Sequence, residues 1–368
     1  MDSVITYRRT LHRIPELDNE LPKTLAFVQS RLEKLRCRLS LPIKGSVCAF
    51  FDAGRAETVA FRADMDALPE TEETGLSFAS EHPGQMHACG HDGHTAMALA
   101  LAEYVDSHLE GLPRNVLFIF QPAEETTGGA RLICETGLLE RLEVRRIFGL
   151  HLWPGLPEGT VWAKSGPQMS RASQITVNIT GESVHISRAD QGRDALLAAV
   201  ELVRQVTETE RNALPPEDPR VLRFGMLHSG DARNVVSGHS ELLGCLRTFS
   251  DASFALLRRE LADTCRRVER STGCDVTLHL NEGYPPVWNH EGLFETVRAG
   301  LGDGEVSLLS QPALAAEDFS FYQQQIPGVF FFLGAGDVPQ LHASTFSFDD
   351  ERILPKGVEF LKKLLVLA

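Results

Sequence analysis

TVAFRADM, residues 58–65, is an apolar run that ends in ionisable side chains. NVLFIFQPAEE at 115–125 and VRRIFGLHLWP at 144–154 repeat this pattern, and an apolar helix-like segment follows the first run at about 95–107. Strand-like runs that alternate with helical segments are typical of an α/β domain, whose functional groups gather at the carboxyl ends of the strands. We therefore expect an α/β fold with a site at one edge of its sheet.

The residues after Pro167 predict a second, smaller domain. The sequence predicts strands at 173–180, 221–228, 241–249 and 275–280. It also predicts two helices, one from 194 to about 210 and a second that ends at about 271. This β-α-β-β-α-β order is typical of a split βαβ, ferredoxin-like α+β domain. We expect residues 1–171 and 283–368 to form the larger domain, with a central mixed sheet flanked by helices, and residues 172–282 to form the inserted one.

The composition excludes several classes of protein. A chain of 368 residues allows about two domains. The formal net charge of -14, without a basic run, argues against a nucleic-acid partner. The sequence has neither a signal-peptide core nor the roughly 18 uninterrupted apolar residues of a membrane helix, so we expect a cytoplasmic protein. Seven scattered cysteines, an odd number, do not indicate disulfides.

MHACGHDGHTA, residues 86–96, concentrates metal-binding residue types in one short stretch. The thiolate of Cys89 and the imidazole of His91 can reach one ion only if the backbone turns tightly between them, and Gly90 permits that turn. A histidine-rich surface turn is the alternative. Ionisable groups also end four other segments where a buried strand has no other reason to place them: RADMDALPE at 62–70, QPAEE at 121–125, GLHLWP at 149–154 and LHAS at 341–344.

The motifs RADMDALP, MHACGHDGH, QPAEE, GLHLWP, EDFS and PGVFFFLG occur together in this order. With them the chain resembles, over nearly its whole length, the metal-dependent amidohydrolases that include hippurate hydrolases, indole-acetyl-amino-acid hydrolases and bacterial aminoacylases. These are relatives of carboxypeptidase G and succinyl-diaminopimelate desuccinylase. The resemblance implies a zinc-peptidase-like catalytic domain with a two-metal site, whose ligands are Cys89, His91, Glu125, His151 and His342.

The chemistry of this ligand set agrees with the resemblance. Thiolate, imidazole and carboxylate together suit zinc, and also manganese, cobalt or nickel. Five protein ligands are too many for one catalytic ion that keeps a position open for water, but they fit two ions that share a ligand. The sequence leaves open which ligand is shared.

The resemblance also assigns roles around the metals. It implies that Glu124 is the general base, and adjacency predicts that the carboxylates of Glu124 and Glu125 diverge and do different work. Asp64 and Asp66 lie two apart in a strand-like run and so share a face, and Asp66 is expected to orient a metal-binding histidine. Asp92 is a weaker candidate for the same task, and His94 is expected only to start a helix.

In the smaller domain, the resemblance implies roles for His185, Asn234 and Arg247. His185 would reach across a homodimer, formed through the inserted domain, to stabilise the oxyanion of the tetrahedral intermediate. Asn234 and Arg247 would bind the backbone and the carboxylate of the substrate, and an arginine can grip a carboxylate with two hydrogen bonds. ESVHISRAD at 182–190 lacks the Gly-Gly-His turn and the Pro-His pair usual in relatives, which bears on substrate choice.

These residues predict hydrolysis of the amide bond of an N-acyl amino acid or a related small amide, by metal-activated water with Glu124 as general base. A dipeptidase or carboxypeptidase would use the same two-metal site. A third alternative makes Cys89 a nucleophile that is activated by His91 and acts through a thioester. A fourth is a metal-binding or ligand-sensing protein that has lost turnover. The acyl group, the amino acid and the metal are not fixed by the residues.

Overall fold

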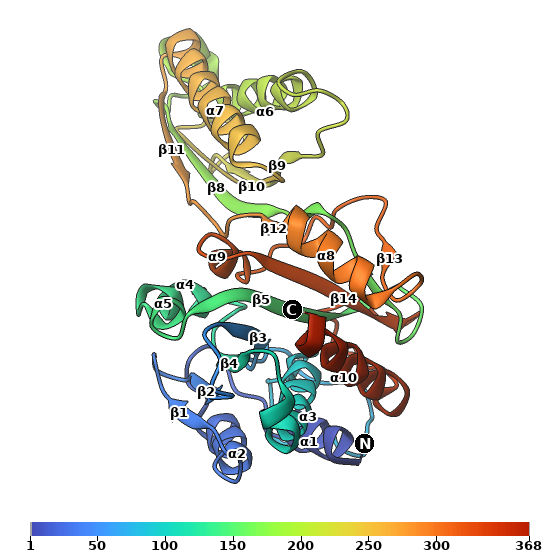
Figure 1. Ribbon diagram of the computed structural model, residues 1–368. Helices are drawn as coiled ribbons and strands as arrows, with labels where there is room; N and C mark the ends of the chain where they lie inside the picture. The colour runs from blue at the N-terminus through green and yellow to red at the C-terminus, as the bar shows by residue number, and fades with distance from the viewer. Residues whose placement is uncertain (1, 368) are drawn as a thin grey trace. The chain divides into compact units, whose positions relative to one another are not determined.

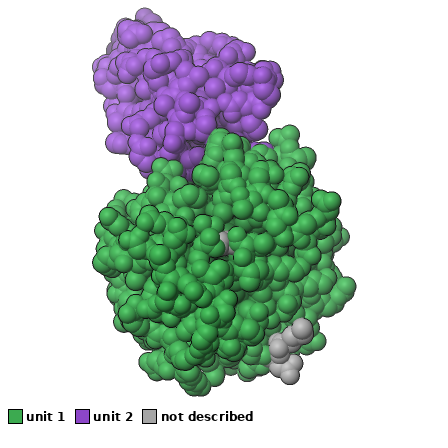
Figure 2. All heavy atoms as spheres, in the orientation of Figure 1, with its two compact units in different colours: residues 1–168, 288–311, 318–368 green, residues 169–287, 312–317 purple. Residues whose placement is uncertain are grey.

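The computed structural model describes residues 2–367, which form two compact units. Unit 1 comprises residues 2–168, 288–311 and 318–367, and unit 2 comprises Met169–Val287 and Pro312–Glu317 (Figure 2). Residues 312–317 pack within unit 2, although the sequence predicts them in the larger domain. The reason is local pairing, because the amide of Ser170 donates to the carbonyls of Ala313 and Ala315.

Unit 1 is built on an eight-stranded mixed sheet of order β1-β2-β4-β3-β5-β14-β6-β13 (Figure 1). Its strands are β1 (Arg38–Ser40), β2 (Val47–Phe51), β3 (Thr58–Asp64), β4 (Asn115–Gln121), β5 (Val144–Pro154), β6 (Val161–Ala163), β13 (Ser307–Leu308) and β14 (Gly328–Gly336). The central strands β4, β3, β5 and β14 run parallel, and all residues of β3, β4 and β14 are buried. Strands buried on both faces explain why these segments read as nearly continuous apolar runs.

Helices cover both faces of this sheet. The helices of unit 1 are α1 (Asp2–Arg13), α2 (Pro22–Leu32), α3 (His91–His108), α4 (Gly129–Glu135), α5 (Leu138–Arg141), α8 (Glu291–Leu301), α9 (Ser320–Gln323) and α10 (Asp350–Leu367), with a 3₁₀ turn at Leu109–Gly111. Helices α1, α3 and α10 pack against one another (Figure 1). The chain moves from β3 through α3 to β4, then back across β3 through α4 and α5 to β5. Right-handed crossovers in opposite directions place α3 and α4 on opposite faces.

Unit 2 is a four-stranded antiparallel sheet of order β11-β8-β10-β9 with two helices. Its elements are β8 (Arg171–Thr180), a 3₁₀ turn (Ile186–Gln191), α6 (Ala195–Asn212), β9 (Val221–Ser229), β10 (His239–Thr248), α7 (Asp251–Thr272) and β11 (Asp275–Leu280). The helices α6 and α7 pack on each other and on the sheet. This arrangement confirms the predicted α/β architecture with a smaller split βαβ domain. The strands β7 (Gly166–Met169) and β12 (Val287–Asn289) pair where the chain passes between the two units. Within residues 2–367, no helix has the length and apolarity needed to cross a membrane.

Candidate metal centre

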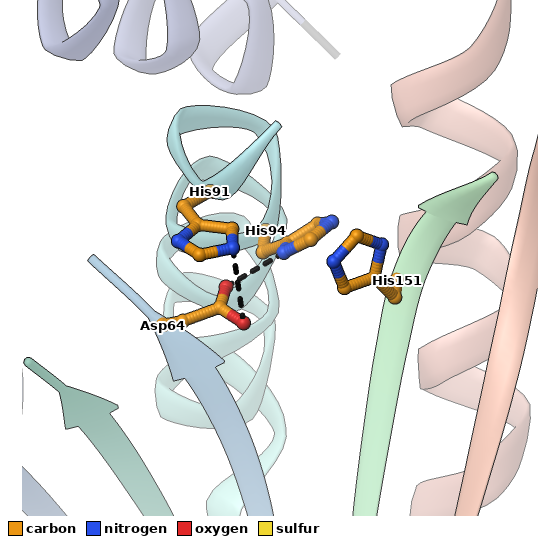
Figure 3. A group of neighbouring side chains, drawn as sticks. All are labelled: Asp64, His91, His94 and His151. Carbon is orange, nitrogen blue, oxygen red and sulfur yellow. Dashed lines mark hydrogen bonds and ion pairs between the residues drawn. The ribbon is translucent and has the colours of Figure 1, made fainter. Parts of the chain in front are cut away.

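The candidate site lies in unit 1, at the end of β3, where the connections from neighbouring strands diverge. Asp64 ends β3 opposite Gln121 of β4. Arg62 pairs with Gly149 of β5, which places His151 level with Asp64. Crevices at such topological switch points are the usual ligand sites of open α/β sheets. The side chains that gather there come from β3, the start of α3 and β5 (Figure 3): Asp64, His91, His94 and His151.

The Cys89-Gly90-His91 turn is the start of a helix rather than an isolated loop. Helix α3 begins at His91, four residues before the predicted start at Thr95. Gly90 caps it in the left-handed conformation, with φ of 83°, and a Cβ atom there would lie 2.9 Å from a methyl carbon of Leu152. Both the backbone and the close approach therefore require glycine. The tight turn at Gly90 therefore sets the direction in which the His91 side chain points.

His91 presents one ring nitrogen to the site and uses the other to hold its position. Nδ1 donates a hydrogen bond to the carbonyl of Asp66 at 2.8 Å. Nε2 is fully buried and has no hydrogen-bond partner within residues 2–367. Carboxylate oxygens of Asp64 and Glu125 lie 3.6 Å and 3.8 Å from it. A buried imidazole nitrogen among carboxylates at these distances fits a metal ion.

Cys89 and His151 form a second pair of suitable ligands. The Nδ1 of His151 donates to the carbonyl of Leu152 at 2.7 Å, so the lone pair is on Nε2. This Nε2 lies 3.5 Å from Sγ of Cys89. Burial is the main reason that the pKa of His151 lies well below its usual value, so the ring is neutral. Both side chains are thus in geometry that allows one ion to be bound between them.

His94 is excluded as a ligand by its own hydrogen bonds. The amide of Leu152 donates to its Nε2 at 2.9 Å, and its Nδ1 donates to Asp64 at 2.6 Å. Both nitrogens are therefore occupied. Its ring packs edge-on against that of His151, with the centroids 4.4 Å apart. His94 fixes Asp64 and the backbone beside His151, a role that exceeds the helix start predicted for it.

Glu124 and Glu125 lie in a turn that Asp66 holds in place. The carboxylate of Asp66 accepts the amides of both residues, at 3.1 and 3.0 Å. Ala123, just before them, has a positive φ of 60°, a conformation uncommon outside glycine that often marks functional sites. Contrary to expectation, the two carboxylates converge, since each has an oxygen within 4.8 Å of a His91 nitrogen. The expectation of divergence covers extended and turning backbones alike, but the left-handed residue before the pair and the two hydrogen bonds to Asp66 turn both carboxylates toward His91.

Asp66 acts on both the turn and His91. Its main-chain carbonyl accepts from Nδ1 of His91, and its carboxylate lies 3.6 Å from the same nitrogen. That carboxylate also accepts the amides of the two glutamates. The side chain that is predicted to orient a metal-binding histidine thus lies beside His91 and also holds the predicted base and its neighbour.

His342 completes the cluster from a different part of the chain. It lies in a loop between β14 and α10, where its φ of 67° is positive. Its amide donates to the carbonyl of Ala88, next to Cys89, at 2.9 Å. Its Nε2 lies 3.3 Å from Glu125, and the three side chains Cys89, Glu125 and His342 have ligand atoms within 4.8 Å of one another. The structure thus brings all five predicted ligands together.

The electrostatics of the cluster favour a cation. Burial would lower the pKa of His91, but Asp64, Asp66 and Glu125 raise it to about 10. Burial, with Glu125 and Glu124, raises the pKa of the Cys89 thiol well above its usual value. The carboxylates that raise the pKa values of both groups gather negative charge here, which a divalent cation would balance.

The residue predicted to stabilise the oxyanion and the two predicted to bind substrate lie in unit 2, at two ends of its sheet: His185, Asn234 and Arg247. His185 and Asn234 are exposed neighbours, because the amide of Ile186 donates to the carbonyl of Asn234 at 2.9 Å. The amide of Ser187 donates to Nδ1 of His185, which makes this nitrogen an acceptor and assigns the ring N–H to Nε2 of an exposed side chain. Arg247 lies near the far end of β10 and donates to the carbonyl of Leu314.

Comparison with known proteins agrees with this geometry. Residues 60–366 match the family described as peptidase family M20/M25/M40. The chain belongs to this family. It is 36% identical over 375 residues to an N-acetyldiaminopimelate deacetylase of Streptococcus uberis, with 99% of each chain covered. It is 34% identical over 364 residues to an enzyme of the same name from Lacticaseibacillus paracasei, covering 96% of this chain and 94% of that one.

A solved structure supports the same assignment. A Bacillus subtilis protein described as a dinuclear metal-binding peptidase of family M20 superimposes with a TM-score of 0.85 at 29% identity, covering 99% of this chain and 96% of the other. The predicted resemblance to metal-dependent amidohydrolases is confirmed, as is the predicted class of enzyme. The buried cluster of unit 1 is thus the candidate metal centre of an M20 family member.

Sequence reasoning missed the buried charges behind this M20 centre. Arg62 donates to Asp64 and to Asp318, each at 2.6 Å, and all three side chains are almost fully buried. Asp318 also accepts the amide of Ala130 at 3.0 Å. The motifs RADMDALP and EDFS contain Arg62 and Asp318, but nothing in their spacing shows that they meet. A charged residue inside an otherwise apolar strand was the available signal.

A second buried network supports the residue after His91. Asp92 accepts hydrogen bonds from Arg8 and from Nδ1 of His12, both at 2.8 Å, and Nε2 of His12 lies 3.2 Å from Glu72. Both nitrogens of His12 thus face carboxylates, which is the arrangement of an imidazolium. Burial would lower the pKa of His12, but Asp92 and Glu72 raise it above its usual 6.5. This network ties α1 to the start of α3.

We expect this network to make stability depend on pH. A histidine whose pKa is raised by folding contributes its full stabilisation below the unfolded value of 6.5, and loses it as the pH rises through the folded value. The difference in unfolding free energy between the wild type and His12→Gln should be largest below pH 6.5 and should shrink as the pH rises above it. Urea unfolding at a series of pH values measures it, and a difference that grows with pH would contradict the assignment.

Proposed function

We propose that this M20 enzyme hydrolyses the amide bond of an N-acyl amino acid with two divalent metal ions, of which zinc is the preferred species. The convergence of Cys89, His91, Glu125, His151 and His342 around one turn carries the proposal. Two relatives with 34% and 36% identity are named N-acetyldiaminopimelate deacetylases, which favours an N-acetylated amino acid over a dipeptide. The thiolate and imidazole ligands favour zinc, while manganese, cobalt and nickel remain compatible.

The metal ions, when bound, would polarise the scissile carbonyl and lower the pKa of an attacking water to about 7. Glu124 would accept the proton of this water and deliver it to the nitrogen of the leaving amine. Its position in the turn suits this shuttle, because its amide is anchored to Asp66 while its carboxylate faces His91. The outward N–H of His185 would donate to the oxygen of the tetrahedral intermediate. Arg247 and Asn234 would bind the carboxylate and backbone of the substrate.

The positions of these residues in unit 2 favour a homodimer. On β10, His239 pairs with Thr180 at the end near His185, and Arg247 pairs with Ala172 at the other end. These ends are eight residues apart, or about 27 Å at ~3.4 Å per residue. An acylated amino acid is too short to contact both ends in one copy, so we infer that His185 and its neighbour Asn234 act in the active site of a second copy.

The surface of unit 2 offers a place for that second copy. Strand β9 is at the edge of the sheet, and exposed edges readily pair with another chain. Met226 and Leu227 on β9 are largely exposed, as are Leu197 and Val200 on α6, which packs beside β9. Apolar side chains along an open edge support pairing of β9 with β9 of the second copy. Such pairing would cover the β9 edge of both sheets at once.

Hybrid dimers test the shared site. A dimer of one His185→Ala chain and one Glu124→Gln chain has one site with both residues intact, so it should regain up to about half the wild-type activity. Differently tagged copies, coexpressed and purified through both tags, supply this dimer. His279→Ala, which changes an exposed histidine on β11, is the matched control and should leave activity unchanged. If the hybrid is as inactive as its parents, His185 does not act across the dimer.

A hydrolysis screen tests the proposed reaction. N-acetyl, N-benzoyl and longer N-acyl amino acids are offered to the enzyme with zinc, manganese, cobalt or nickel, and products are separated by chromatography. We expect turnover of at least one series, loss with a chelator and recovery with divalent metal. Insensitivity to chelator with inactivation by a thiol alkylator would favour Cys89 as a nucleophile. Bound metal without any hydrolysis would favour a non-catalytic role. The cytoplasmic location stays a prediction.

A further inference from the structure

His342 is held differently from the other four proposed ligands. Cys89, His91, Glu125 and His151 have side chains that are nine-tenths or more buried, whereas the side chain of His342 is 53% exposed. It belongs to a loop outside any helix or strand, and its φ of 67° is one that side chains rarely adopt. Neither packing nor secondary structure therefore fixes this ligand, so contacts of its loop must do so.

Two residues after His342, the loop is fastened at two points to Glu73. The amide of Glu73 donates to the carbonyl of Ser344 at 2.8 Å. In return, the hydroxyl of Ser344 donates to the carboxylate of Glu73 at 2.7 Å. This pair, here called the Glu73–Ser344 clamp, uses the backbone and the side chain of both residues. The amide of His342 also donates a hydrogen bond to the carbonyl of Ala88. The loop is therefore held at His342 itself and again two residues later, at the clamp.

The other end of the clamp is tied to the helix that bears His91. Glu72, adjacent to Glu73, accepts the amide of Ser80 at 2.6 Å and lies 3.2 Å from Nε2 of His12. His12 in turn contacts Asp92, which follows His91 in α3. A continuous series of polar contacts thus runs from the start of α3 to the His342 loop. Through it, a ligand on a helix and a ligand on an exposed loop share one support.

We propose that Glu73 and Ser344 are positioning residues that hold His342 against Glu125 and so set the affinity of the metal position that His342 serves. Neither residue touches substrate or metal in this assignment. The inference rests on the proposed two-metal function and deepens it, because it makes one of the two positions depend on a surface clamp. Ligands held by such supporting contacts commonly lose affinity when the support is removed.

Metal release from the full-length enzyme tests the clamp. Wild type, Ser344→Ala, Glu73→Gln and the double variant are loaded with two equivalents of zinc, and transfer to a chromophoric chelator is followed. We expect one equivalent to be held about 3- to 10-fold more weakly in Ser344→Ala, and less so in Glu73→Gln, whose amide oxygen still accepts the hydroxyl, with the other equivalent unchanged. The double variant should lose no more than Ser344→Ala alone, since both changes act on the same hydrogen bond. Ser344→Thr, which keeps the hydroxyl, should restore tight binding.

Glu81→Gln is the matched control. It makes the same change of charge in the same loop, and its exposed side chain has no hydrogen-bond or ionic partner within residues 2–367. It should release both equivalents as the wild type does. Hydrogen exchange supplies a readout without metal, because the amide of His342 should exchange faster in Ser344→Ala than in Glu81→Gln.

The results separate the clamp from the function on which it rests. If both equivalents weaken together, if neither changes, or if the double variant shows the sum of the single effects, the clamp does not position His342. If the wild type itself binds fewer than two equivalents, the two-metal function fails before the clamp is tested, and the exchange experiment alone then decides whether the clamp holds the loop.

Discussion

Glu124→Gln is expected to lower kcat by about 10²- to 10⁴-fold, the usual contribution of a positioned general base. The amide keeps the size of the side chain but cannot accept a proton. The backbone bond from residue 124 to Asp66 is unaffected, so the turn should keep its shape. Steady-state kinetics on the substrate found in the hydrolysis screen, with metal content measured by mass spectrometry, gives the result.

Metal content separates the base from its neighbour. Glu124→Gln should retain close to two equivalents, whereas Glu125→Gln should lose metal as well as activity, because Glu125 faces both His91 and His342. A Glu124→Gln enzyme with more than about a tenth of wild-type kcat would remove Glu124 from the proton transfer.

Arg62→Met is expected to lower the free energy of unfolding by about 3–5 kcal/mol, the usual cost of breaking a buried ion pair. Arg62 lies between Asp64 and Asp318, and its loss leaves two buried carboxylates without their cation. Burial would raise the pKa of Asp64, but His91, Arg62 and His94 hold it well below its usual value. Urea unfolding of the metal-free protein, followed by circular dichroism, measures the change.

Arg9→Met is the matched control for this prediction. Arg9 also contacts two carboxylates, on Asp350 and Glu351, but its side chain is 37% exposed. Ion pairs whose cation is open to solvent contribute about 0–1 kcal/mol, and the buried carboxylate of Asp350 keeps its contact with Arg8, so the control should change stability by no more than about 1 kcal/mol. Adding Asp318→Asn to Arg62→Met should recover part of the loss, because it neutralises one of the two stranded carboxylates. Equal effects of Arg62→Met and Arg9→Met would contradict the assignment.

Local patterns predicted the strands well because burial on both faces leaves a plain apolar signal. The same burial hid the start of α3. Its first nine residues, His91–Leu99, are all buried, so no change of polarity marks a boundary, and the left-handed Gly90 that sets it carries no sequence signal of its own. The ligand motifs were predictable because each is a short run with an unusual residue type.

Contacts between distant segments were not predictable. Strand periodicity places Asp64 and Asp66 on one face, and both carboxylates lie 3.6 Å from His91. Because β3 ends at Asp64 and the chain then turns, Asp66 also holds the glutamate turn, which periodicity does not predict. Arg62 and Asp318 meet across 256 positions of sequence. The positive φ of His342 depends on contacts with Ala88 and on its loop, which no local pattern encodes.

The order of the strands has a consequence for how the enzyme is made. Strand β14 pairs with β5 on one side and β6 on the other, so the large sheet stays open until residues 328–336 have been synthesised. Nearly all of unit 2 is contiguous and leaves the ribosome earlier. Contacts between distant parts of a chain form slowly, because a long loop must close first. We expect unit 2 to fold early and metal uptake to wait for the last tenth of the chain, so that a prematurely ended product carries no complete centre.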